Sequence, residues 1–167
     1  MNDNEQEIII PLTLMPSWLS KRITPQRDET KLTRAAQRGD WSAREIMAHL
    51  RDTEAIYYPK LHLLVTNEFP DLRRAAGPVP TSHKLDDSTF TVMSQFRRLR
   101  QSTLSLLREL PRDAWRRAGR DVDGSSMTIR DFALELTRHD AEHLRQLDET
   151  LIARNALPPG VLPLVTR

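Results

Sequence analysis

Two histidines in the last third of the chain have the spacing of metal ligands on a helix. His139 and His143 lie four residues apart in the segment His-Asp-Ala-Glu-His. At about 100° per residue, their imidazoles point within about 40° of each other, and they lie about 6 Å apart along the helix axis. His49 occupies the apolar stripe of another predicted helix. The three imidazoles together predict a three-ligand site with open positions for water or substrate, as catalytic metals require.

These histidines are compatible with two other interpretations. Each imidazole alone is compatible with a hydrogen-bonded position in a helical core. The placement of all three on apolar stripes favours the metal site. His139 to His143 also fits the H-x-x-E-H pattern of inverted zinc peptidases. Those enzymes take a further acidic ligand from far downstream, for which the chain after His143 is too short, so we reject the peptidase interpretation.

The composition narrows the chemistry to oxygen and nitrogen ligands. The chain has 167 residues, no cysteine and five histidines. Disulfides, thiolate-bound zinc, iron–sulfur clusters and a cysteine nucleophile are therefore excluded, and any metal must be bound by His, Asp or Glu. The length predicts one domain, spanning residues 1–167, and 29% charged residues with a net charge of +2 indicate a soluble globular protein.

The histidines are positioned by two long helical patterns. One begins with a capping box formed by Ser42 and Glu45, carries His49 and continues to about Asn67. The other begins at Thr128, with Asp131 three residues later as a weaker capping pair, and ends before the proline pair at 158–159.

Two further helical patterns complete the predicted fold. One covers about 13–23, and the other runs from about 87 to 110 and ends at Pro111. The sequence therefore predicts an all-α, four-helix bundle, with a long Pro-rich loop at 68–85 between the second and third helices. Residues 119–127 are predicted to be irregular.

Arginine is concentrated in the third predicted helix and the segment after it. Arg97, Arg98, Arg100 and Arg108 lie largely outside the apolar stripe of that helix, and acidic residues interrupt the run. We therefore expect a solvated face and no nucleic-acid surface.

The apolar stretch near the N-terminus is broken by Pro11 and is too short to span a membrane. No targeting peptide is recognised, so a cytoplasmic protein is expected.

Two segments of the chain resemble one known family. Trp41 to Glu54 is similar to the motif W-S-x-x-E-x-x-x-H-L-x-D-x-E, and Gly124 to Gln146 is similar to a closing segment that ends in H-D-x-E-H-x-x-Q. Both motifs belong to the DinB-like (YfiT-like) metal-binding four-helix bundles. The resemblance extends from about Trp41 to Leu151.

This resemblance implies a divalent ion, most often zinc or nickel, bound by His49, His139 and His143. Relatives include transferases and isomerases that act with low-molecular-weight thiols, and metal-dependent hydrolases. Members of the family frequently form homodimers, so a homodimer is expected here. We therefore expect a metal-dependent transferase or hydrolase that acts on a small-molecule substrate. Because the chain has no cysteine, any thiol must be a cosubstrate. The alternative is a non-catalytic metal-binding bundle that acts through protein partners.

Two polar residues are candidates for catalytic roles beside the metal. Asp52, one turn after His49, is placed to accept an imidazole N–H or a proton from bound water. Gln146, nearly one turn after His143, is placed to orient water or substrate. Each could instead be a solvated polar residue.

Three other ionisable residues are expected to lie outside the site. Glu54 projects about 140° away from His49 and is predicted to have a structural role, such as bonding a helix end. His62 is predicted to face elsewhere on the same helix, and His83 to be a solvated loop residue.

Overall fold

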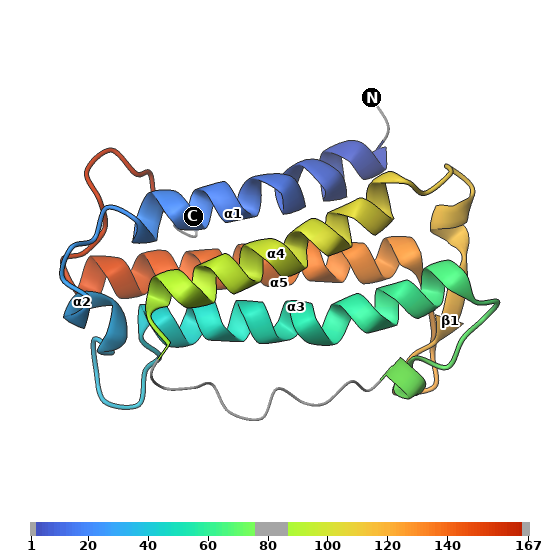
Figure 1. Ribbon diagram of the computed structural model, residues 1–167, viewed down its shortest axis with the longest axis horizontal. Helices are drawn as coiled ribbons and strands as arrows, with labels where there is room; N and C mark the ends of the chain where they lie inside the picture. The colour runs from blue at the N-terminus through green and yellow to red at the C-terminus, as the bar shows by residue number, and fades with distance from the viewer. Residues whose placement is uncertain (1–2, 76–86, 165–167) are drawn as a thin grey trace.

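The protein is a bundle of four long helices, as predicted. The computed structural model describes residues 3–75 and 87–164. The long helices lie side by side along the long axis of the molecule (Figure 1). They are α1 (Ile10–Ile23), α3 (Ala43–Thr66), α4 (Thr89–Arg108) and α5 (Ile129–Ala153).

The helices that carry the histidines begin where the sequence predicts. The Ser42 hydroxyl accepts a hydrogen bond from the backbone N–H of Glu45, and the Glu45 carboxylate accepts one from the Ser42 backbone. Thr128 and Asp131 form the same reciprocal pair at the start of α5. Each box satisfies two backbone donors that have no partner within the helix, which fixes the first turn of each helix.

The segment before α5 differs from the sequence expectation. The stretch predicted to be irregular contains an antiparallel hairpin of β1 (Ala118–Arg120) and β2 (Ser126–Thr128). In the connection Gly124 has a φ of +87°, which glycine adopts without a steric penalty. Gly119 of β1 packs closely against the chain after α3, where an added Cβ would lie 2.7 Å from the Pro70 carbonyl oxygen.

The remaining short elements modify the predicted boundaries. A π-helical segment, Glu5–Ile9, leads directly into α1, so the N-terminal helix begins earlier than predicted. A short helix, α2 (Thr30–Thr33), follows α1, and Ala114–Arg116 form a 3-10 turn before the hairpin. The predicted loop at 68–85 contains a 3-10 turn at Leu72–Ala75, and its part from residue 76 on, with His83, lies outside the described residues.

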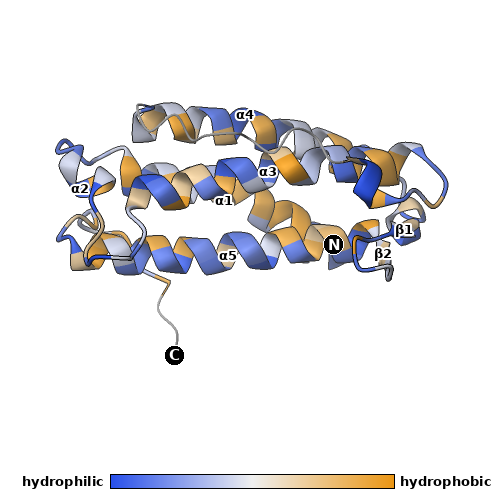
Figure 2. Cartoon of the chain, turned by 90° about the horizontal axis from the view of Figure 1, so that it is seen from below, coloured by the Kyte–Doolittle hydropathy of each residue, from blue (hydrophilic) through white to orange (hydrophobic). Residues whose placement is uncertain are grey.

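The core consists of two apolar clusters with a layer of charge between them. One cluster includes Leu50, Phe96 and Leu144, and the other includes Leu104 and Leu136. Hydrophobic residues alternate with hydrophilic ones along each long helix, as amphipathic packing requires (Figure 2). No helix among the described residues combines the length and the hydropathy needed to cross a membrane.

Arg100 lies in the layer between the clusters, and the prediction that it belongs to a solvated face is wrong. Its side chain is fully buried rather than solvated. Its Nε and Nη2 donate to Glu54 at 3.0 and 2.8 Å, and its Nη1 and Nη2 donate to Asp140 at 2.6 and 3.0 Å. Glu54 is structural, as predicted, but its partner is Arg100 rather than a helix end. Burial alone would lower the pKa of Arg100, but the carboxylates of Asp140 and Glu54 raise it above its usual value.

The carbonyl oxygen of Leu12 in α1 is the fifth acceptor for this guanidinium. Pro16 lies inside α1 and has no N–H to donate to the carbonyl oxygen of Leu12, four residues earlier. Arg100 Nη1 donates to that oxygen at 3.2 Å. All five N–H donors of Arg100 are therefore used, as a buried charge requires.

Candidate metal centre

The structure brings the three predicted histidines together between α3 and α5. Each of His49, His139 and His143 offers a ring nitrogen, and the three atoms lie within 4.8 Å of one another. The Nε2 atoms of His49 and His139 are 2.9 Å apart. The ring of His143 lies 4.5 Å from that of His49 and 4.4 Å from that of His139, measured between centroids. All three side chains are half-buried.

The environment of His139 keeps its imidazole neutral and ready to bind a cation. Burial, together with the charges of His143, His49 and Arg100, lowers the pKa of His139 to about 4. Its Nδ1 is buried and has no hydrogen-bond partner among the described residues. Three converging imidazoles, one of them with a buried nitrogen that none of the described residues satisfies, fit the ligand set of a divalent transition metal.

Gln146 lies directly behind His143. Its Oε1 is 2.7 Å from His143 Nδ1, and the two side chains come from adjacent turns of α5. A glutamine oxygen accepts a hydrogen bond, so this contact places the proton of His143 on Nδ1 and leaves the lone pair on Nε2. The contact orients His143, whereas the sequence predicted that Gln146 would orient water or substrate, a role that stays a prediction.

Asp52 is partly buried and lies on α3, three residues after His49. Its Oδ1 accepts a hydrogen bond from Arg51 Nε at 2.8 Å, and Arg51 Nη1 also donates to Gln95 of α4 at 2.7 Å. The carboxylate is thus held by a side chain that bridges α3 and α4. The predicted role of Asp52 as a proton acceptor remains a prediction.

Trp41 is a neighbour of the histidines for which the sequence predicted no role at the site. Its ring lies 5.1 Å from the ring of His49 and stacks nearly parallel to that of His143, at 6.1 Å. Trp41 immediately precedes Ser42, the N-cap of α3. This position, about two helical turns before His49, was the feature of the sequence that could have indicated its proximity to the histidines. The indole therefore covers one side of the imidazole cluster.

A cleft of about 490 Å³ adjoins this covered side of the cluster. Trp41 and Gln146 both line it, so it lies next to the histidines. Its other lining residues are mainly small or polar: Ala36, Gln37, Gly39, Asp40, Glu149, Thr150 and Ala153. A small polar molecule would fit this space.

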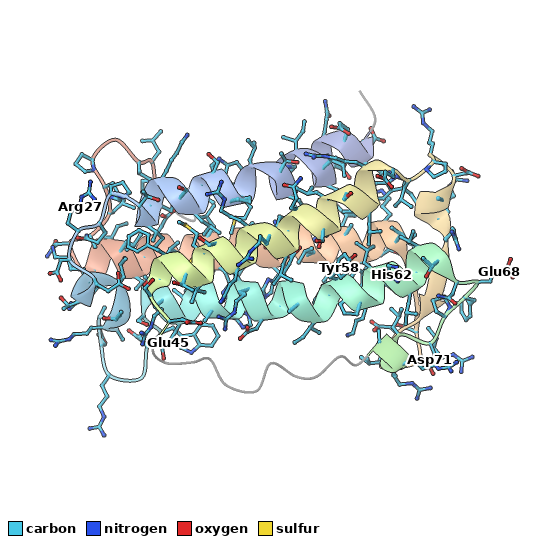
Figure 3. The ribbon with its side chains drawn as sticks, viewed as in Figure 1. Arg27, Glu45, Tyr58, His62, Glu68 and Asp71 are labelled. Atoms are coloured by element: carbon cyan, nitrogen blue, oxygen red, sulfur yellow. The ribbon has the colours of Figure 1, made fainter. Side chains whose placement is uncertain are left out.

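The prediction that His62 lies outside the cluster is confirmed. Its side chain is exposed. Figure 3 shows it towards the opposite end of α3 from Glu45, which lies one turn before His49. Of the four histidines among the described residues, the three predicted as ligands are therefore the ones that the structure brings together.

Comparison with known proteins agrees with the fold. The model of the DinB superfamily matches residues 17–147, so the chain belongs to this superfamily. YfiT from Bacillus subtilis, described as a probable metal-dependent hydrolase with an unusual four-helix bundle topology, is similar in structure. The TM-score is 0.66 at 18% identity, and the match covers 89% of each chain. The sequence has no match among curated proteins.

Proposed function

We propose that this protein is a metal-dependent enzyme whose divalent ion, zinc or nickel, is held by His49, His139 and His143. The observation that carries the proposal is the convergence of three imidazole nitrogens within 4.8 Å. The similarity to YfiT, described as a probable metal-dependent hydrolase, supports a catalytic rather than a purely structural ion.

The chemistry of such a site is the activation of a weak nucleophile. When bound, a divalent ion lowers the pKa of a water or a small thiol towards neutrality and so supplies a hydroxide or thiolate. Hydrolysis and thiol transfer are therefore the two reaction types that we propose. A thiol would be a low-molecular-weight cosubstrate, because the chain has no cysteine.

The surrounding residues of this chain would prepare the site in three ways. Gln146 fixes the tautomer of His143 through its 2.7 Å contact. Trp41 shields one side of the cluster from water. Asp52, held by Arg51, is the group that we propose accepts a proton from the activated nucleophile.

The neighbouring cleft favours a small-molecule substrate over a protein partner. Its volume of about 490 Å³ and its polar lining suit a compact polar ligand better than a protein surface. A cytoplasmic location and a homodimer remain predictions from the sequence.

Metal analysis of the purified protein tests this proposal directly. We expect close to one divalent ion per chain in the unaltered protein and a large loss in His139→Ala and His143→Ala. His62→Ala is the matched control, because His62 is exposed and lies outside the cluster, and it should keep full occupancy. Full occupancy in the His139→Ala and His143→Ala variants would show that the site is wrong.

A screen for activity then separates the two reaction types. The metal-loaded protein is incubated with small electrophiles and ester or amide substrates, with and without small thiols. Turnover that requires a thiol indicates transfer, and turnover without one indicates hydrolysis. If the loaded protein and its His139→Ala variant give equal turnover, the enzymatic proposal fails even if the metal binds.

A further inference from the structure

A groove of about 600 Å³ lies between α1 and α4, apart from the cleft beside the histidines. The α1 side presents short side chains, Thr13, Pro16, Ser17 and Ser20, which leave room between the two helices. The α4 side presents mainly arginines. The groove has a hydroxyl-bearing wall and a cationic wall.

The cationic wall follows from the helical repeat of α4. Arg97, Gln101, Leu104 and Arg108 follow one another at spacings of four, three and four residues, so they share one face of the helix. Arg98 lines the same groove from the adjacent position. Arg97 and Arg108 are about 16 Å apart along the helix axis, so the wall extends over three turns.

Among the described residues, no carboxylate pairs with Arg97, Arg98 or Arg108. Asp and Glu are absent from the residues that line the groove. Arg97 and Arg98 have no hydrogen-bond or ion-pair partner among the described residues. Arg108 donates to the hydroxyl of Thr13 at 2.8 Å, which leaves its charge unpaired. These exposed guanidinium groups therefore keep most of their donors for a ligand.

The base of the groove does not compete for such a ligand. Arg100 also lines the groove, but all five of its N–H donors are used by Glu54, Asp140 and the Leu12 carbonyl. An anion would therefore be held by the arginines of the rim. On the opposite wall, the Ser17 hydroxyl has no partner among the described residues and can donate to the same anion.

We propose that this groove binds a small phosphate-bearing molecule. The planar fork of a guanidinium matches the oxygens of a phosphate, and charge-assisted bonds of this kind are the strong ones. Arginines spread over three turns suit a ligand with several phosphate groups. The wall covers only about three turns of one helix and the net charge of the chain is only +2, which favours a small molecule over nucleic acid. This site is independent of the proposed metal centre.

The test is isothermal titration calorimetry of the full chain with sodium tripolyphosphate at physiological ionic strength. Arg97→Gln/Arg98→Gln removes two groove charges, and Arg112→Gln/Arg116→Gln removes two exposed charges elsewhere. We expect the groove pair to weaken binding about tenfold or more, and the control pair to weaken it less than about twofold. Ser17→Leu, which narrows the groove without changing its charge, should also weaken binding.

Three results would overturn the proposal. Equal weakening of binding in both double variants would indicate diffuse electrostatic attraction. Unaltered binding in the Arg97→Gln/Arg98→Gln variant would place the anion elsewhere, for example at the histidines. Tighter binding of a short DNA duplex than of tripolyphosphate, lost in the groove pair, would assign the groove to nucleic acid. Tripolyphosphate and adenosine triphosphate, compared on the unaltered chain, then distinguish a bare phosphate chain from a nucleotide.

Discussion

Arg100 and Asp140 are joined by two hydrogen bonds in the middle of the core, and Asp140 directly follows His139 in α5. The guanidinium that separates the two apolar clusters is therefore bonded to the residue next to a candidate metal ligand. The same guanidinium is bonded to Glu54 of α3 and to the Leu12 carbonyl of α1. All four long helices thus meet at one side chain beside the proposed site.

Removing the charge of Arg100 should strongly destabilise the bundle. Arg100→Met leaves Glu54 and Asp140 buried without a counter-charge, at a cost of about 3–5 kcal/mol in the free energy of unfolding. Arg98→Met, an exposed neighbour, should change it by less than about 0.5 kcal/mol. Urea unfolding measures both. Equal stability of the two variants would contradict the role of this ion-pair layer.

Replacing the whole layer by apolar residues should recover much of that loss. In the triple variant Arg100→Met, Glu54→Leu and Asp140→Leu, no buried charge remains unpaired. We expect it to be more stable than Arg100→Met alone in the same urea experiment. A triple variant that is less stable than the single one would indicate that packing, not charge pairing, dominates here.

Gln146 should tune metal affinity without being a ligand. Gln146→Ala removes the acceptor of His143 Nδ1 and should weaken binding of zinc about 10- to 100-fold. Gln146→Glu keeps an oxygen acceptor and should restore affinity. Gln101→Ala on α4 serves as the control. Competition with a chromophoric chelator gives the dissociation constants, and an unchanged affinity in Gln146→Ala would argue against the orienting role.

The metal-free protein should lose stability as the pH falls from 6.5 towards 4. The pKa of His139 is lowered from 6.5 to about 4 by burial and neighbouring charges, so between these values the unfolded chain binds a proton that the folded chain does not. Stability therefore rises with pH across this window. The slope should flatten in His139→Gln but not in His62→Gln. Identical slopes in all three proteins would show that His139 does not titrate in this way.

The hairpin should tolerate no side chain at Gly119. A Cβ there would lie 2.7 Å from the Pro70 carbonyl oxygen and 2.9 Å from Leu64 Cδ2. Gly119→Ala should therefore cost about 1–3 kcal/mol in the free energy of unfolding. Ser126→Ala, on the exposed start of β2, is the control, and thermal or urea unfolding distinguishes them. A neutral Gly119→Ala would mean that the hairpin can move away from α3.

Local rules were sufficient to predict the helices and the convergence of the histidines. The capping boxes at Ser42 and Thr128 depend on residues three positions apart, and the helical repeat alone places His139 and His143 on one face. The approach of His49 follows once amphipathic helices bury their apolar stripes together. The Asp-Gly pair at 123–124 was also a local hairpin signal, and the irregular structure predicted there was wrong.

The buried position of Arg100 could not be predicted by the same rules. It lies four residues after Phe96 on the buried stripe of α4, so its position carried a signal. Arginine is nevertheless almost always exposed unless it is paired. Its partners Glu54 and Asp140 are 46 and 40 positions away, on other helices. Such pairing is a property of the assembled bundle. The contact of Trp41 with His143, which lies on another helix, likewise forms only in the assembled bundle.

The sequence separation of the three histidines determines how late during synthesis the proposed metal site becomes complete. His49 and His139 are 90 positions apart. At ribosomal rates, about 5–20 residues per second, the second imidazole is synthesised roughly 5–20 s after the first. An ion bound by all three histidines of the proposed site therefore cannot guide the nascent N-terminal half, because that site is complete only after His143 has been synthesised. In the proposed enzyme, the ion would then stabilise a bundle whose three ligands have all been synthesised.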